Sequence, residues 1–198
     1  MEASDDARSD AGHLDPDLLE HGDTRNVVDR YRNWTMEAIV EDLDARRHPF
    51  HVAIENFEHD MNIGSVVRSA NAFLAAEVHI VGHRRWNRRG AMVTERYQHV
   101  RHHASIEDLV AWAGCAELPL IGIDNVEGSV PIETYDIPRA CVLVFGQEGP
   151  GLSAQAQEAC VDLLAITQFG STRRINAGAA AAVAMHAWIR QHEFGQIP

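Results

Sequence analysis

The sequence predicts an α/β fold in which a mostly parallel sheet is flanked by helices, and three observations support this. From Pro49 onward, short apolar runs typical of strands alternate with segments that carry apolar residues at helical spacing. Two of these strand-like runs lead into turns that contain glycine. The last helical segment, 176–192, is rich in alanine, which is a strong helix former with little side-chain bulk.

The segment before Pro49 is interpreted as an N-terminal extension of the sheet domain. Residues 1–23 are acidic and short of large apolar side chains, which predicts disorder. Residues 24–47 carry apolar side chains at roughly helical spacing, which predicts helix. We therefore expect two parts, the extension at 1–48 and an α/β domain at 49–198.

Within the α/β domain each predicted element follows from its local pattern. Strands are predicted at 50–55, 77–82, 118–123, 140–145 and 161–166, and helices at 62–75, 106–114, 152–158 and 176–192. Ligands of such sheets gather at the carboxyl ends of the strands. The loops that follow strands 50–55, 118–123, 140–145 and 161–166 are therefore expected to converge on one binding edge.

Composition restricts the class of protein. A chain of 198 residues with 45% hydrophobic residues is long enough for one domain with a core. No apolar run approaches the roughly 18 residues of a membrane span, and the N-terminus lacks the features of a signal peptide. The three cysteines are odd in number and lack metal-ligand spacing, so we expect reduced thiols in a cytoplasmic protein without a membrane partner. They are Cys115, Cys141 and Cys160.

The distribution of charge matters more than its total. The net charge of −12 argues against a nucleic-acid partner, but residues 1–48 alone hold 13 acidic and 6 basic residues. Residues 84–101 hold six arginines against the single acid Glu95. Arginines interleaved with Trp86 suit contact with phosphates and stacking on bases, and the alternative is a solvated loop. The candidate RNA contacts are Arg84, Arg85, Arg88 and Arg89.

The segment 62–71 could carry chemistry at the start of a helix. Asp60 or Asn62 is expected to cap that helix, and Gly64 permits close approach in its first turn. Arg68 follows Asn62 by under two turns, so both are expected to face one cleft. The alternative is an ordinary capped helix with a surface arginine.

Two further loops have the composition of binding sites. Residues 145–153 carry three glycines after a buried strand, so main-chain groups there can meet a ligand directly, and Glu148 is their one charge. This segment contains no P-loop motif, and no GxGxxG follows the first strand, which disfavours an ordinary Rossmann site. The turn at 170–176 places Arg173, Arg174 and Asn176 before the alanine-rich helix. The alternatives are a tight connecting turn and solvated arginines.

A histidine metal site is not expected. The histidines at 99, 102 and 103 have no common ligand spacing, and no acid stands close to them in the sequence. We therefore predict a protein that uses no metal.

Taken together and in order, these motifs resemble the SpoU/TrmH branch of the SPOUT RNA methyltransferases over about residues 49–192. The first motif appears as Asn62-Ile-Gly64-Ser-Val-Val-Arg68. The second appears as the glycine-rich turn at 145–152. The third appears as the strand end at 166–170, followed by Arg174-Ile175-Asn176 and a helix of small residues.

This resemblance implies a deep trefoil knot, a homodimer and the cofactor S-adenosylmethionine. The implied reaction is methylation of a ribose 2′-hydroxyl in tRNA or rRNA, and methylation of a base is a further alternative. Arg68 either transiently gives up its proton beside an RNA phosphate or, as we favour, stays charged and steadies the developing alkoxide. Glu148 and Asn176 would position Arg68 and the ribose. The implied catalytic residues are Asn62, Arg68, Glu148 and Asn176. The implied cofactor-binding positions are Ile123, Gly146, Ile166, Arg174 and Ile175.

The sequence departs from the family pattern at several positions. Arg174 stands where the family has serine, Thr167 and Gln168 replace proline and methionine, and Leu74 replaces a glycine. Pointing outward, Arg174 would add a contact to RNA phosphate; pointing inward, it would repel the cationic sulfonium. The alternative function is therefore a non-catalytic, knotted RNA-binding protein with an impaired methyl-donor site.

Overall fold

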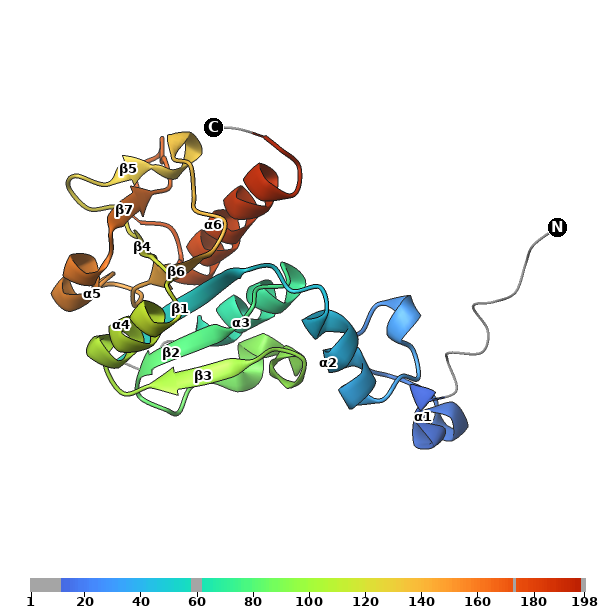
Figure 1. The fold of residues 1–198 in the computed structure, drawn as a ribbon. Coiled ribbons are helices and arrows are strands. Elements are labelled where there is room, and N and C mark those ends of the chain that lie inside the picture. The colour runs from blue at the N-terminus through green and yellow to red at the C-terminus, as the bar shows by residue number, and fades with distance from the viewer. Residues whose placement is uncertain (1–11, 58–61, 173, 197–198) are drawn as a thin grey trace. The chain divides into compact units, whose positions relative to one another are not determined.

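A computed structural model describes residues 12–57, 62–172 and 174–196 (Figure 1). The chain divides after Arg46 into two compact units, and each is described by itself. Among the described residues, no helix is both long and apolar enough to cross a membrane.

The described part of the N-terminal unit contains short helical elements. Helix α1, Pro16–His21, begins with proline after Asp15, whose carboxylate accepts a hydrogen bond from the Asp17 amide at 2.9 Å. The predicted disorder of 1–23 is therefore wrong over α1, because this cap satisfies the first amides of the helix. Residues 1–11 lie outside the described part of the chain.

The predicted helix at 24–47 is interrupted. A 3₁₀ turn, η2 (Asp29–Tyr31), precedes helix α2, Met36–Asp44. The hydroxyl of Thr35 accepts from the Ala38 amide at 3.2 Å and starts α2 after the break. An N-cap residue with extended backbone dihedrals cannot lie inside a helix, so any helix upstream of it must end before it. The apolar periodicity alone therefore predicted a longer helix than the structure contains.

The second unit is built around a parallel sheet. Its described strands are β1 Phe50–Asn56, β2 Val78–Gly82, β3 Val100–His103, β4 Leu120–Ile123, β5 Val130–Pro131, β6 Cys141–Phe145 and β7 Asp162–Ala165. They pair in the order β3-β2-β1-β6-β4-β7-β5, and every pairing is parallel. The predicted α/β fold with a parallel sheet is confirmed, while the trefoil knot stays a prediction.

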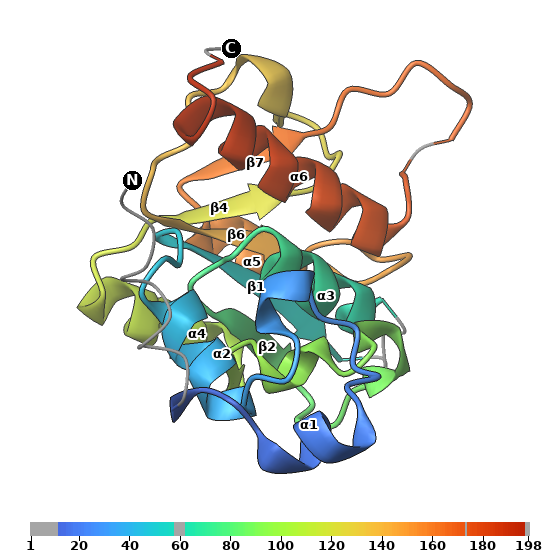
Figure 2. The ribbon, with the colours of Figure 1, turned by 90° about the vertical axis from the view of Figure 1, so that its right-hand side faces the viewer.

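Helices cover both faces of this sheet. They are α3 Ile63–Ala72, α4 Ile106–Cys115, α5 Ala154–Ala159 and α6 Ala177–His192, with 3₁₀ turns η3 Arg88–Ala91, η4 Thr94–Arg96 and η5 Ile132–Thr134. Figure 2 shows α3 and α6 in front of the strands. Val52 and Ile54 of β1 belong to the core cluster under α3 and α6, whereas Ala53 belongs to the cluster under α4 and α5.

The alanine-rich helix α6 lies very close to α3. A Cβ added to Gly178 would come within 3.2 Å of the Ser65 Cβ, and Ala181 and Ala184 are fully buried. Small side chains therefore let the amino-terminal ends of α3 and α6 meet, as the composition of 176–192 predicted. This contact brings the segments around Asn62 and Asn176 together.

Three histidines on adjacent strands form a row beneath α4, here called the histidine row. His51 Nδ1 lies 3.1 Å from His79 Nε2, and His79 Nδ1 lies 2.9 Å from His103 Nε2. A neutral imidazole carries one donor and one acceptor, so three neutral rings satisfy both contacts. Burial lowers the pKa of His79 to about 2 and also lowers the pKa values of His51 and His103.

The cysteines are unpaired and differ in exposure. Cys141 is buried in β6, Cys160 is half-buried, and Cys115 is exposed at the end of α4. Burial raises the pKa of both Cys141 and Cys160 to about 12. These two thiols therefore stay protonated at neutral pH.

Candidate functional site

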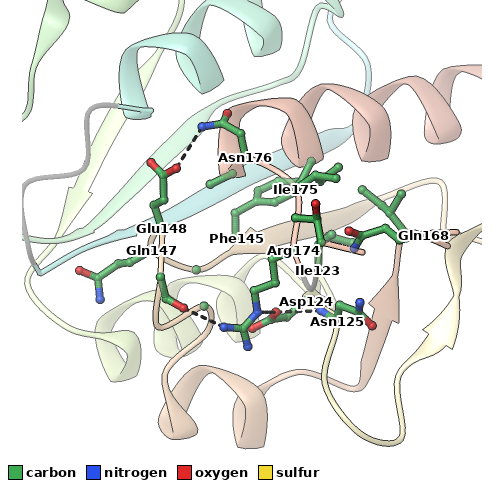
Figure 3. Close-up of a pocket in the computed structure, with 17 residues that line it drawn as sticks. Ile123, Asp124, Asn125, Phe145, Gln147, Glu148, Gln168, Arg174, Ile175 and Asn176 are labelled. Atoms are coloured by element: carbon green, nitrogen blue, oxygen red, sulfur yellow. Dashed lines mark hydrogen bonds and ion pairs between the residues drawn. The ribbon is translucent and has the colours of Figure 1, made fainter. Parts of the chain in front are cut away.

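A pocket of about 570 Å³ lies at the carboxyl ends of β4, β6 and β7 (Figure 3). This volume lies within the range of small-molecule and cofactor sites. Its walls come from the loops after these three strands and from the first turn of α6, so the predicted convergence on one edge is confirmed for them. Its lining includes Ile123, Asp124, Phe145, Gly146, Glu148, Ile166, Arg174, Ile175 and Asn176.

The glycine-rich loop after β6 folds back on itself to form one wall. Gln147 and Gly151 exchange backbone hydrogen bonds of 3.1 and 3.0 Å. A Cβ on Gly146 would lie 2.0 Å from the Gly151 carbonyl carbon, so no larger residue fits there. The side chain of Gln147 accepts from the Phe57 amide at 3.0 Å, which ties this loop to the end of β1.

Three of the four predicted catalytic residues meet at the border of the pocket. The Asn176 side-chain amide donates to Asn62 Oδ1 at 2.9 Å and to Glu148 Oε1 at 3.3 Å, and the Asn62 amide donates to Glu148 Oε2. Asn176 also caps α6 by accepting from the Ala179 amide at 3.2 Å. We call these three side chains the Asn–Glu–Asn cluster.

The predicted cap of α3 is wrong for Asn62. Asn62 occupies the N-cap position in a helical conformation, and its side chain makes no capping bond. It binds Glu148 and Asn176 instead, because the close approach of α3 and α6 places those partners beside it. The other candidate cap, Asp60, lies outside the described residues.

Arg68 is not part of this cluster. It is exposed on α3 and makes no hydrogen bond or ion pair with the residues the structure describes. Its separation from Asn62 along the helix turns it by about 240° at 3.6 residues per turn, so the two side chains leave different sides of α3. No described contact brings the two side chains together, and the expectation that both face one cleft stays a prediction.

Arg174 spans the pocket instead of pointing into solvent or toward its apolar wall. Its Nε lies 3.0 Å from Asp124 Oδ1, and its Nη1 donates to the Gly149 carbonyl at 2.8 Å. The Asp124 side chain is only 5% exposed and accepts from the Leu152 amide at 2.9 Å. Figure 3 shows this Arg174–Asp124 ion pair between the loops after β4 and β6. Its negative partner offsets the charge of the guanidinium.

The sequence-based interpretation missed Asp124. Asp124 follows the apolar strand β4 directly, and its amide donates to the Leu164 carbonyl of β7 at 3.0 Å. An acid at the carboxyl end of a buried parallel strand was the available signal. The predicted cofactor positions Ile123, Gly146, Ile166, Arg174 and Ile175 all line the same pocket.

The predicted RNA contacts lie on a braced loop after β2, residues 83–90, here called the arginine loop. The amide of Asn56 donates to the carbonyls of His83 and Arg85 at 2.6 and 2.9 Å. A Cβ on Gly64 would come within 2.8 Å of the Gly90 Cα, so the loop packs tightly on α3. The four side chains are exposed, as expected for RNA contacts: Arg84, Arg85, Arg88 and Arg89.

One group among the described residues has the spacing of metal ligands, and it differs from the histidines weighed in the sequence. His51, Glu77 and His79 each offer a ligand atom within 4.8 Å of the others. His51 already contacts His79, and Arg101 Nε donates to both oxygens of Glu77 at 3.1 Å. Polar partners thus occupy these atoms, and the prediction of no metal stays a prediction.

Comparison with known proteins identifies the class of this chain. The sequence profile of the SpoU rRNA methylase family matches residues 49–186. An "uncharacterized tRNA/rRNA methyltransferase" of Mycolicibacterium vanbaalenii is 32% identical over 151 residues, which cover 71% of this chain and 46% of that protein. The chain thus spans about half the length of this curated relative.

Solved structures share the fold. The SpoU methyltransferase AviRb from Streptomyces viridochromogenes, crystallised with AdoMet, superposes with a TM-score of 0.68 at 24% identity, over 77% of this chain and 61% of that one. A structure described as an RNA 2′-O ribose methyltransferase superposes with a TM-score of 0.65 at 22% identity, over 75% and 59%. At these identities the likeness concerns the fold alone.

Proposed function

Because the chain belongs to the SpoU rRNA methylase family, we propose that it is an S-adenosylmethionine-dependent enzyme that methylates ribose 2′-hydroxyl groups of RNA. The Asn–Glu–Asn cluster at the border of a cofactor-sized pocket is the observation that best supports this activity. A structured tRNA is the foremost substrate, with rRNA the other candidate.

The pocket suits S-adenosylmethionine by its shape and chemistry. Ile123, Phe145, Ile166 and Ile175 give it apolar walls for a flat base, and the loop after β6 presents main-chain groups. When bound, this cofactor supplies an electrophilic methyl group on a cationic sulfur. The buried carboxylate of Asp124 offsets the charge of Arg174, so the pocket as a whole does not oppose a cationic ligand.

The Asn–Glu–Asn cluster would hold the ribose. Glu148 receives hydrogen bonds from the amides of Asn62 and Asn176, which fix its carboxylate at the pocket border. In this position the carboxylate accepts a hydrogen bond from the attacking ribose hydroxyl and draws its proton away as the oxygen becomes nucleophilic. An amide-anchored acceptor needs little reorganisation during the reaction.

Arg68 would act from outside the pocket. A guanidinium stays protonated in proteins, so Arg68 serves as a fixed positive charge beside the developing alkoxide or a neighbouring phosphate. Its exposure and its lack of polar partners among the described residues suit a side chain completed by RNA or by a second copy of the chain. A cytoplasmic homodimer is the assembly we propose, and the braced arginine loop would hold the RNA.

Two measurements test the proposal. Calorimetry with S-adenosylhomocysteine should give micromolar binding, and wild-type protein should transfer methyl groups to unmodified tRNA or rRNA transcripts. Nucleoside analysis should then identify 2′-O-methylated products. Glu148→Gln and Arg68→Ala should keep cofactor binding and lose methyl transfer. Absence of binding at millimolar ligand would refute the enzyme and favour a non-catalytic RNA-binding protein, while a methylated base would refute ribose specificity.

A further inference from the structure

A second cavity lies at the β3 edge of the sheet, apart from the pocket proposed to hold S-adenosylmethionine, here called the proposed methyl-donor pocket. It measures about 260 Å³, and its lining comes from β2, from the arginine loop, from η4 and from the edge strand β3. The residues that matter here are Arg84, Trp86, Arg88, Glu95 and Arg101. None of these five residues lines the pocket at the ends of β4, β6 and β7.

Trp86 gives this cavity a fixed aromatic wall. Its indole is half-buried and packs against the core beneath α3. Arg88 Cζ lies over the Trp86 ring, 5.7 Å from its centroid, so this exposed guanidinium covers the face that a base would use and must move toward a flanking phosphate when a base stacks there. The backbone on either side is held, because Asn56 binds the carbonyl of Arg85 and Gly90 packs on Gly64. Because its backbone is already held in place, such a wall lets a base stack with little loss of conformational entropy.

Glu95 gives the cavity an acceptor that lacks a donor. Its Oε2 is buried and has no hydrogen-bond partner among the described residues. Arg84, Arg88 and Arg101 line the same cavity, yet none forms an ion pair with Glu95, and Arg101 is bound to Glu77. A buried carboxylate oxygen without a partner is costly, so the Glu95 side chain is stabilised if it turns this oxygen toward the cavity and accepts from a ligand N–H group.

We propose that this cavity binds one unpaired RNA base, which stacks on Trp86 and donates from an exocyclic amino group to Glu95 Oε2. The flanking phosphates then meet Arg84 and Arg88. Adenine, cytosine and guanine carry such an amino group on the pairing edge, whereas the one donor of uracil there, N3–H, stands between two carbonyl oxygens that would repel the carboxylate. Single-stranded RNA is read through its unstacked bases in this manner. The site therefore favours amino-bearing bases over uracil.

The inference rests on the proposed function only in taking RNA as the substrate. It adds a nucleotide-recognition site that lies away from the reacting ribose. The cavity would select which unpaired base the protein engages while the Asn–Glu–Asn cluster holds the target ribose.

Fluorescence anisotropy with labelled single-stranded RNA tests this site. Two oligonucleotides of equal length are compared at one salt concentration without cofactor, one of alternating adenosine and cytidine and one of uridine. Wild-type protein should bind the adenosine–cytidine strand about tenfold more tightly, which corresponds to about 1.4 kcal/mol. Equal affinity for the two strands would overturn the proposal.

Variants separate the parts of the site. Glu95→Gln should abolish the preference for the adenosine–cytidine strand, because a glutamine amide also donates to uracil oxygens. Glu107→Gln, at an exposed position on α4, removes the same charge and should keep that preference. Trp86→Ala should weaken the binding of both RNA strands by about tenfold. Arg88→Ala should weaken the binding of both RNA strands and reduce the salt dependence of their affinity. A Glu95→Gln protein that keeps the wild-type preference would also refute the site.

The outcome is distinguishable from failure of the proposed function. Arg68→Ala and Glu148→Gln should retain the base preference, because neither residue lines this cavity. A protein that shows the preference but transfers no methyl group would contradict the enzyme and leave the base site standing. An active methyltransferase that shows no base preference would support the proposed enzyme and contradict the base site.

Discussion

Acidification should destabilise this protein through the histidine row. His79 is fully buried between His51 and His103, and burial lowers its pKa from 6.5 to about 2. In the unfolded chain the same imidazole titrates near its ordinary value. Below about pH 6.5 the unfolded state therefore binds a proton that the folded state refuses, and the free energy of unfolding falls as the pH falls.

The size of the effect follows from the unfolded pKa. Because the folded pKa of His79 lies well below 5, its folded form stays neutral down to about pH 5, where the unfolded state gains about 2 kcal/mol from this one residue. The lowered pKa values of His51 and His103 act in the same direction. A loss of about 2 kcal/mol is a large share of the stability of a domain.

Urea denaturation between about pH 7.5 and about pH 5, followed by circular dichroism, measures this loss. His79→Gln lacks the titrating group, so its stability should vary with pH by about 2 kcal/mol less than that of the wild type. His186→Gln, at an exposed position on α6, is the matched control and should keep the wild-type dependence. A His79→Gln protein with an unchanged pH dependence would refute the assignment of a buried neutral imidazole.

Three further predictions concern the proposed methyl-donor pocket. Arg174→Ser leaves the Asp124 carboxylate without its ion-pair partner, so the pocket should favour a cationic ligand more strongly. Calorimetry should show that the affinity for S-adenosylmethionine, relative to that for S-adenosylhomocysteine, rises about tenfold. An unchanged ratio of the two affinities would mean that Arg174 does not influence the sulfonium. Gly146→Ala places a Cβ 2.0 Å from the Gly151 carbonyl carbon, so binding of S-adenosylhomocysteine should be lost and thermal stability should fall, and retention of both would show that the loop can open. Asn176→Ala removes a helix cap and the donor to Glu148, and it should cost about 1 kcal/mol in denaturation and abolish methyl transfer, whereas Asn176→Asp should keep the cap alone.

The apolar pattern predicted the central strands because those strands are buried on both faces. It missed β3, whose Arg101 and His102 carry polar side chains, and β5, which has two residues. Both are edge strands in the sheet order, where one side needs no strand partner and apolar runs are not required. Sequence periodicity therefore detects the middle of such a sheet better than its edges.

The composition of the pocket was predictable, whereas its internal pairing was not. Glycines after a strand marked the loop wall, and Asn62 and Asn176 were named from their motifs. The orientation of Arg174 depends on Asp124, which lies 50 residues earlier in the chain and on another strand. The release of Asn62 from its capping role depends likewise on α6. Contacts between distant segments determine the orientation of Arg174 and the role of Asn62, and local sequence patterns do not predict such contacts.

The unequal exposure of the thiols makes the protein convenient for site-specific labelling. Maleimide reagents attack the thiolate, and burial keeps Cys141 and Cys160 in the thiol form at neutral pH. Cys115 is exposed at the end of α4, where the chain turns back to begin β4, so it lies at the strand edge opposite the proposed methyl-donor pocket. A dye placed there would report on tumbling and subunit exchange in unmutated protein while leaving both proposed ligand sites unobstructed.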